Sequence, residues 1–299
     1  METIQSIIVP VDFSPNSSAA VERASALAKR FGASLHLVHG ITVPIAGIPH
    51  EFAVPGPDWE TIRQAAQKEL DAIADELQGR GHEVTANIHR AEAVPAIQKE
   101  IEDQRGSLVV MGSAGHTGLS RFILGSIAER TLRSVSIPVI AVKEDTEAAK
   151  SEIRKIVLAT DFSDHSRAAE DWALTLAKGF NARVEICHVT YVPTATWASV
   201  EIPPPVSLEE DLRREATPRI EEVLKRFKEE KVEADTHLIS SAPSLAIPAL
   251  AEELGADLLV MGTRGTSGLR HVLLGSVAER TVRMSSCSVV AVPRPEPTK

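Results

Sequence analysis

Two glycine-rich segments have the residue types and spacing of an anion-binding loop. In the first, a short apolar run is followed by Gly112, Gly115, Gly118, Gly125 and Ser126. Glycines let backbone amides approach a phosphate closely, and the unpaired amides of a helix's first turn carry partial positive charge. The segment therefore predicts a phosphate site between the end of a strand and the start of a helix.

The same pattern recurs 150 residues later, as Gly262, Gly265, Gly268, Gly275 and Ser276. In each copy a glutamate follows the serine by three residues, which is the spacing of a capping box. This spacing predicts that Ser126 and Ser276 are the N-caps of helices. A cap and a phosphate ligand are compatible roles, so both interpretations stay open for each serine.

Polar side chains also follow the first two apolar runs of each half. Asp12 and Asp161 end the first run, and open α/β sheets bind ligands at the carboxyl ends of their parallel strands. The alternative is a carboxylate that accepts hydrogen bonds from the following helix. His39 and His188 end the second run, and we interpret them as packed histidines rather than catalytic bases.

The loops lack the lysine that a P-loop places directly before its serine or threonine to neutralise the β and γ phosphates. No water-positioning glutamine or base stands near them in the sequence. The pattern predicts nucleotide binding without fast hydrolysis, and an enzyme is not the favoured interpretation. No metal-ligand motif is present, so the residues that would hold a metal are left open.

Strand patterns alternate with helix patterns along both halves, which predicts parallel pairing with right-handed crossovers. The predicted fold class is α/β, with two tandem doubly wound, Rossmann-like domains that each contain a parallel five-stranded sheet. We place the domains at residues 1–144 and 153–299, joined by a linker at 145–152. Proline-rich loops are predicted at 43–58 and 193–207.

The composition restricts the partners and the compartment. The formal net charge of −9 over 299 residues argues against nucleic acid or an anionic membrane surface as the main partner. No apolar run approaches the length of about 18 residues that predicts a membrane span, and no leader pattern is present, so we expect a cytoplasmic protein. Cys187 and Cys287 form no disulfide framework and are expected to be buried.

The spacing of Gly112, Gly115 and Gly125-Ser126 resembles that of the ATP-binding branch of the universal stress protein family. The resemblance extends over essentially the whole chain, because both halves repeat the motif, the strand-terminal aspartate and the long loop. It implies a tandem protein whose domains have the adenine nucleotide alpha hydrolase-like form of the fold.

The resemblance also implies which residues form the nucleotide sites. In the first half these are Pro10, Asp12, Gly40, Met111, Gly112, Gly115, Gly125, Ser126 and Ile127. In the second half they are Ala159, Asp161, Val189, Met261, Gly262, Arg264, Gly265, Gly275, Ser276 and Val277. The aspartate and the backbone after the second strand would hold the adenosine part, and the loop amides and the serine would hold the phosphates.

The two halves depart from the family pattern in different ways. The first half has Gly40 where the family usually has an apolar residue, which the second keeps as Val189. The first loop has Ala114 where the second has the basic Arg264. These differences predict that the second site binds at least as tightly as the first.

The resemblance implies a stress-response regulator that binds adenine nucleotide, namely ATP, and the charge of the phosphates predicts an accompanying Mg²⁺. Two alternatives stay open: a slow ATPase or nucleotide-dependent transferase, and a nucleotide-free interaction module that dimerises. The last strand of each half, 139–142 and 289–292, is predicted to be an apolar edge strand. The resemblance implies that these strands meet in an intramolecular pseudo-dimer, and a homodimer of the chain is a further expectation. The sequence identifies no protein partner.

Overall fold

The computed structural model describes residues 4–42, 58–114, 124–143, 149–191, 206–265 and 274–293. Several predicted features lie outside these ranges. They are Gly115, Gly118, Gly268, almost all of both proline-rich loops, and linker residues 145–148.

The described residues of the first half form five strands and four helices in alternation. In chain order they are β1 (Ser6–Pro10), α1 (Pro15–Phe31), β2 (Ser34–Gly40), α2 (Trp59–Gly79), β3 (Val84–His89), α3 (Ala93–Gln104), β4 (Leu108–Gly112), α4 (Ser126–Ser134) and β5 (Val139–Val142).

The second half repeats this order. Its elements are β6 (Lys155–Ala159), α6 (Asp164–Phe180), β7 (Arg183–Thr190), α8 (Val206–Glu229), β8 (Ala234–Ser240), α9 (Pro243–Glu253), β9 (Leu258–Gly262), α10 (Ser276–Met284) and β10 (Ser288–Val292). The last strands, predicted at 139–142 and 289–292, are observed at Val139–Val142 and Ser288–Val292.

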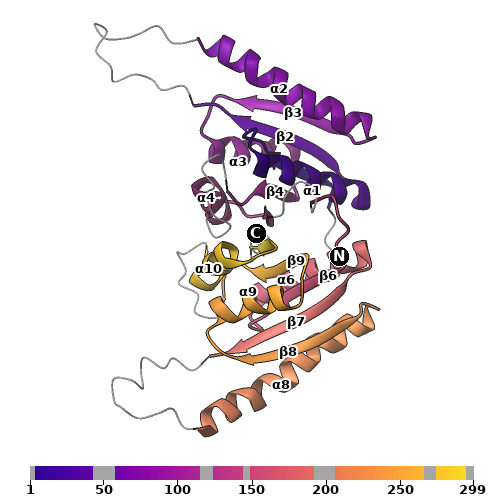
Figure 1. Ribbon diagram of the computed structural model, residues 1–299, viewed down its shortest axis with the longest axis vertical. Coiled ribbons are helices and arrows are strands. Elements are labelled where there is room, and N and C mark those ends of the chain that lie inside the picture. Colours follow the sequence, from indigo (N-terminus) through magenta and orange to yellow (C-terminus); the bar gives the residue numbers. More distant parts are fainter. Residues whose placement is uncertain are drawn as a thin grey trace, which may run out of the picture.

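The ten strands found in the described parts of the chain belong to one sheet, in the order β3-β2-β1-β4-β5-β10-β9-β6-β7-β8 (Figure 1). Strands within a half are parallel, whereas β5 and β10 pair antiparallel, with Ile140 opposite Val290. The predicted meeting of the last strands is confirmed. Each half contributes five parallel strands, as predicted, with β5 and β10 at the edges of the two five-strand units, and the antiparallel pairing of these edges joins the units into a single sheet.

Helices cover both faces of the sheet and enclose two apolar layers. Residues of α1, α2, α6 and α8 pack in one layer, and residues of α3, α4, α9 and α10 pack in the other. Each layer contains side chains from both halves, so the hydrophobic core continues across the junction. None of the helices in the described parts of the chain has the length and hydropathy that crossing a bilayer would require.

The turn from β1 into α1 illustrates how local sequence fixes the ends of a helix. Ser14 is the N-cap and its hydroxyl accepts from the Ser17 amide at 3.2 Å, while Pro15 occupies the first helical turn. Gly32 ends the helix with a positive φ of 69°, a conformation that glycine adopts without strain. This turn brings Asp12 to the carboxyl end of the sheet.

Candidate functional sites

Two cavities lie where the strand order reverses, between β1 and β4 in the first half and between β6 and β9 in the second. Their volumes are about 370 Å³ and about 410 Å³. A reversal of strand order leaves a crevice at the carboxyl ends of the strands, because the two flanking connections leave toward opposite sides. The repeated sequence therefore produces two equivalent crevices, the first and the second cavity.

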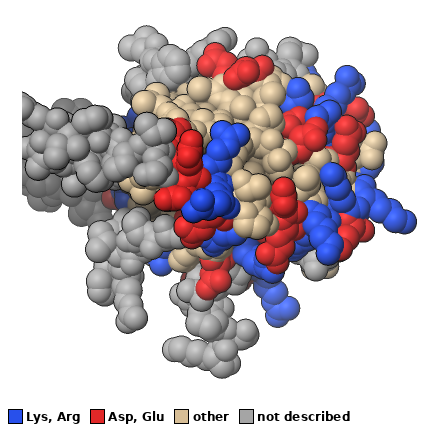
Figure 2. Space-filling view, turned by 90° about the horizontal axis from the view of Figure 1, so that it is seen from below, with Lys and Arg blue, Asp and Glu red and all other residues tan. Residues whose placement is uncertain are grey.

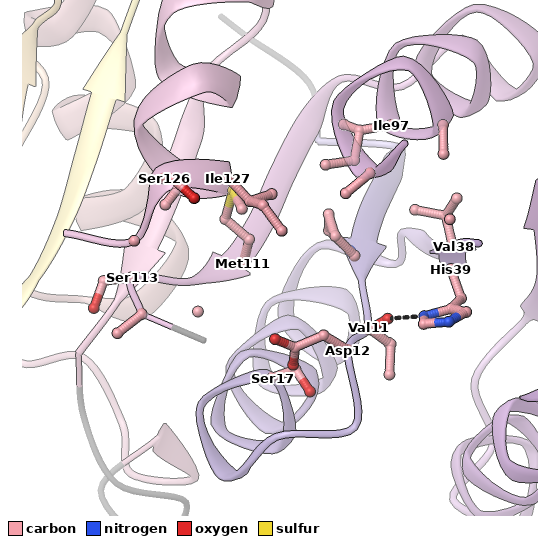
Figure 3. A pocket seen from close by; sticks show the side chains of 18 residues that line it. Val11, Asp12, Ser17, Val38, His39, Ile97, Met111, Ser113, Ser126 and Ile127 are labelled. Carbon is pink, nitrogen blue, oxygen red and sulfur yellow. Dashed lines mark hydrogen bonds between the residues drawn. The ribbon is translucent and has the colours of Figure 1, made fainter. Parts of the chain in front are cut away.

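The first cavity brings together every predicted site residue that the structure describes in that half. They are Pro10, Asp12, Gly40, Met111, Gly112, Gly125, Ser126 and Ile127. Asp12 and Ser17 lie on one side of the cavity, and Ser126 and Ile127 lie on another (Figure 3). Gly115 lies outside the described residues, so its predicted role stays a prediction.

The second cavity contains all the predicted residues of its half. They are Ala159, Asp161, Val189, Met261, Gly262, Arg264, Gly265, Gly275, Ser276 and Val277. Residues that are 100 positions apart in the chain meet here because β6 and β9 are neighbours in the sheet. The contacts of these residues decide what the cavity can bind.

Asp12 and Asp161 each combine a structural contact with a place at the cavity wall. Asp161 Oδ1 accepts from the Ser163 amide at 3.1 Å and from the Ser163 hydroxyl at 2.6 Å. Asp12 Oδ1 makes the same two contacts with Ser14, at 3.0 Å and 2.5 Å. The alternative interpretation of these carboxylates, as acceptors at the start of a helix, is therefore confirmed, and it leaves the ligand role untested.

The capping-box prediction is wrong at both serines. The N-caps of α4 and α10 are Gly125 and Gly275, and no side chain makes a capping hydrogen bond there. Ser126 and Ser276 occupy the first helical position instead, and both are exposed. The amide of this glycine donates to the carbonyl of the residue that follows β4 or β9, Ser113 or Thr263, at 2.7 Å in each half. This bond holds the glycine in the extended cap conformation.

This helix start leaves backbone donors at the cavity wall. The first amide to bond within α10 is that of Glu279, which donates to Gly275 at 2.9 Å. The amides of Ser276, Val277 and Ala278 precede that bond, and all three residues line the second cavity. The first cavity has the same arrangement at Ser126, Ile127 and Ala128. Each cavity thus presents a helix N-terminus and a serine hydroxyl that makes no capping bond.

Several of the predicted glycines are required by close packing. A Cβ on Gly112 would lie 2.9 Å from the Asn16 carbonyl oxygen, and one on Gly262 would lie 3.0 Å from that of His165. A Cβ on Gly265 would lie 2.5 Å from Asp161 Oδ2. Gly265 therefore keeps the loop close to the carboxylate, and any side chain there would displace Asp161.

Close packing also requires glycine at position 40. A Cβ at this position would lie 2.9 Å from the carbonyl oxygen of Ala91 and 3.1 Å from the Cβ of Ala96 on α3. Helix α3 therefore approaches β2 too closely for the valine that the second half has at Val189. This departure from the family pattern is an adjustment of helix packing at the cavity wall.

The two histidines line the cavities and are held by the backbone, as predicted. His39 Nδ1 donates to the Val11 carbonyl at 2.6 Å, and His188 Nδ1 donates to the Thr160 carbonyl at 2.8 Å. Burial lowers the pKa of His188 from its ordinary value, so at neutral pH the ring carries a single proton, on Nδ1. The His188 ring is therefore a neutral wall element with an unprotonated Nε2.

Sequence reasoning missed the wall residues that no motif marks. Arg219 reaches the second cavity from α8, and Cys187 reaches it from β7. Cys187 is 1% exposed, and burial raises the pKa of its thiol to about 12, so it acts as an apolar group. The helical pattern around Arg219 placed it on a predicted amphipathic helix, but nothing in that pattern related it to a loop 45 residues later.

Within the described residues, no group of three or more His, Cys, Asp or Glu side chains is arranged to hold a metal ion. Mg²⁺ is commonly bound through substrate phosphates and one or two carboxylates, and keeps several waters. Among the described wall residues each cavity has one carboxylate, Asp12 or Asp161, and this fits that mode of binding.

Comparison with known proteins identifies the group to which these features belong. A sequence model described as the universal stress protein family matches residues 3–143 and again residues 152–293. A universal stress protein of Mycolicibacterium smegmatis is 29% identical over 291 residues, which cover 96% of each chain. One from Methanocaldococcus jannaschii is 38% identical over 147 residues, covering 48% of this chain and 84% of that protein.

A solved structure gives the same result for the fold. The crystal structure of a universal stress protein from Archaeoglobus fulgidus superposes with a TM-score of 0.70 at 24% identity, covering 98% of both chains. The fold of the whole chain, both halves included, is therefore similar to that of a protein of nearly the same length.

Proposed function

The chain belongs to the universal stress protein family, and from that membership and its two cavities we propose that it binds adenine nucleotide, as ATP with Mg²⁺, in each half and acts as a stress-response regulator. The observation that carries the proposal is the helix start at each cavity. Three amides outside the helical bonding pattern, an exposed serine hydroxyl and an aspartate line one crevice. Donors of this kind suit phosphate oxygens.

The remaining walls suit the adenosine part. In the first cavity Val38, Ala96, Ile97 and Met111 provide apolar surface of the kind that encloses a flat ring. Micromolar affinity, about 8 kcal/mol at the usual standard state, is a reasonable scale for such a site.

Calorimetric titration of ATP with Mg²⁺ into the purified chain tests the proposal. Ile127→Trp should fill the first cavity and abolish one binding event, and Val277→Trp should abolish the other. Leu245→Trp is the matched control, because Leu245 is 55% exposed on α9 and does not line the cavity. Absence of binding to the parent chain, or equal binding by all variants, would contradict the proposal.

Turnover should be slow, as the sequence predicts. No lysine occurs among the described residues that line either cavity. We expect ATP hydrolysis far below the roughly 1–100 s⁻¹ typical of kinases. A rate inside that range that disappears in the cavity-filling variants would favour an ATPase instead.

A further inference from the structure

Arg219 is held at the rim of the second cavity by an aromatic stack. Its guanidinium carbon lies 4.6 Å from the centre of the Phe162 ring, and its Nη2 donates to the Phe162 carbonyl at 3.3 Å. The Phe162 ring stacks in turn on His188 at 4.2 Å between centroids. Because Phe162 directly follows Asp161, this stack fixes a cation beside the ligand-facing carboxylate.

The second cavity therefore has two arginines in its wall, Arg219 from α8 and Arg264 from the glycine loop. A guanidinium presents a planar fork of donors that matches two phosphate oxygens, and it stays charged at every physiological pH. Adenosine has no group that needs such a partner, whereas each added phosphate brings negative charge toward both arginines.

The first cavity lacks this charge. Leu70 and Ile220 are buried at corresponding positions of α2 and α8, and they align Glu69 with Arg219. Ala114 corresponds to Arg264, and no arginine or lysine occurs among the described residues that line the first cavity. In composition, the glycine-loop segments outside the described ranges, 115–123 and 266–273, have one arginine and one histidine each.

We propose that the two cavities take different classes of adenine ligand. The second selects by phosphate number through Arg219 and Arg264, and the first, which has the same helix-start donors but no arginine or lysine among its described wall residues, depends much less on phosphate number. This inference rests on the proposed function and specifies it for each site. It makes Arg219 a specificity-determining residue that lies outside the glycine motif.

Photolabelling of the intact chain with 8-azidoadenosine measures each site separately, since peptide mass mapping assigns the label to one half. Competition with adenosine, AMP, ADP and ATP then gives the phosphate dependence of each half. In the second half we expect ATP to compete at least about tenfold better than adenosine. In the first half the competing affinities of ATP and adenosine should agree within about threefold.

Variants then test the residues. Arg219→Glu should lower the preference of the second half for ATP over adenosine by about tenfold, while adenosine competes as before. Introducing Glu69→Arg with Ala114→Arg should create a preference for ATP in the first half.

Arg213→Glu is the matched control, because it makes the same charge reversal on α8 at an exposed residue that does not line the cavity. Acidic and basic side chains are interleaved over the end of the molecule where α8 lies (Figure 2). Reversing one charge there therefore changes the overall electrostatic potential of this surface little. An equal effect of Arg213→Glu and Arg219→Glu would overturn the inference, as would equal phosphate dependence in both halves. Absence of specific labelling in either half would instead overturn the proposed function, and the inference with it.

Discussion

Ser126 and Ser276 lack the capping role that the sequence predicts, and their role as phosphate ligands stays a proposal. Their hydroxyls make no capping bond, so Ser126→Ala and Ser276→Ala should change the free energy of unfolding by less than about 0.5 kcal/mol. Ser276→Ala should nevertheless weaken ATP binding about tenfold, because a hydroxyl bond to a charged oxygen is lost. Denaturant unfolding and calorimetric titration measure the two effects.

Ser14 and Ser163 supply the control, because they are true N-caps with hydroxyls 3.2 Å and 3.3 Å from the amides they accept. Their replacement by alanine should lower stability by about 0.5–2 kcal/mol. If Ser276→Ala were as destabilising as Ser163→Ala, the hydroxyl would have a structural role that contradicts our assignment.

Lys143 joins the two halves and has an unusual titration. Its Nζ donates to the carbonyls of Arg283 at 2.7 Å and Ser285 at 2.8 Å, at the C-terminal end of α10. Burial lowers its pKa from 10.5 to about 8. Between these values the unfolded chain binds more protons than the folded chain, so the contribution of this residue to stability rises with pH.

This contribution can be measured by comparison with Lys143→Met. The difference in unfolding free energy, parent minus variant, should increase from pH 7 to pH 9.5. Comparing the two proteins at each pH removes the titration of all other groups. A difference that stays constant or decreases over this range would contradict the lowered pKa.

At the scale of elements, β5 and β10 determine how the halves are joined. Each has a neighbour on both sides, since Ile140 pairs with Val110 and Val290, and Val290 pairs with Val260 and Ile140. A proline at Val290 would remove a backbone donor at the centre of the sheet, where proline is poorly tolerated. Limited proteolysis should then cut the linker at 145–152 faster than in the parent chain.

Val84→Pro is the control for this prediction. Val84 begins β3, at the far end of the sheet, where a strand's first residue tolerates proline. It should leave the cutting rate of the linker nearly unchanged. Equal acceleration by both prolines would indicate general loosening rather than opening of the β5–β10 junction.

At the scale of the whole molecule, each half provides the surface that the other needs. The β5 residues Val139–Val142 are at most 1% exposed in the full chain. In a fragment of residues 1–143 they would form an apolar, unpaired sheet edge, which favours association with another edge. We expect this fragment to dimerise in sedimentation experiments, and Ile140→Lys to prevent it. A folded fragment that stays monomeric at about 100 μM would contradict the prediction, since this exceeds the dissociation constant of most stable dimers.

The sequence by itself determined the order of strands and helices, the doubling of the fold and most of the candidate site. It could do so because hydrophobic periodicity is a local property, and because parallel strands place their carboxyl ends at one edge. Asp12 and Gly112 could therefore be assigned to one crevice although 100 residues separate them. The assignment of site residues to a nucleotide stays a prediction.

Only the tertiary structure decided which residues complete each cavity and where each helix begins. Gly125 became the N-cap instead of Ser126 because its amide bonds to Ser113, a contact set by the placement of β4. Arg219 became part of the second cavity because packing of Ile220 in the core fixes the rotation of α8 about its axis. Such contacts depend on how distant elements pack, and no local pattern in the sequence encodes them.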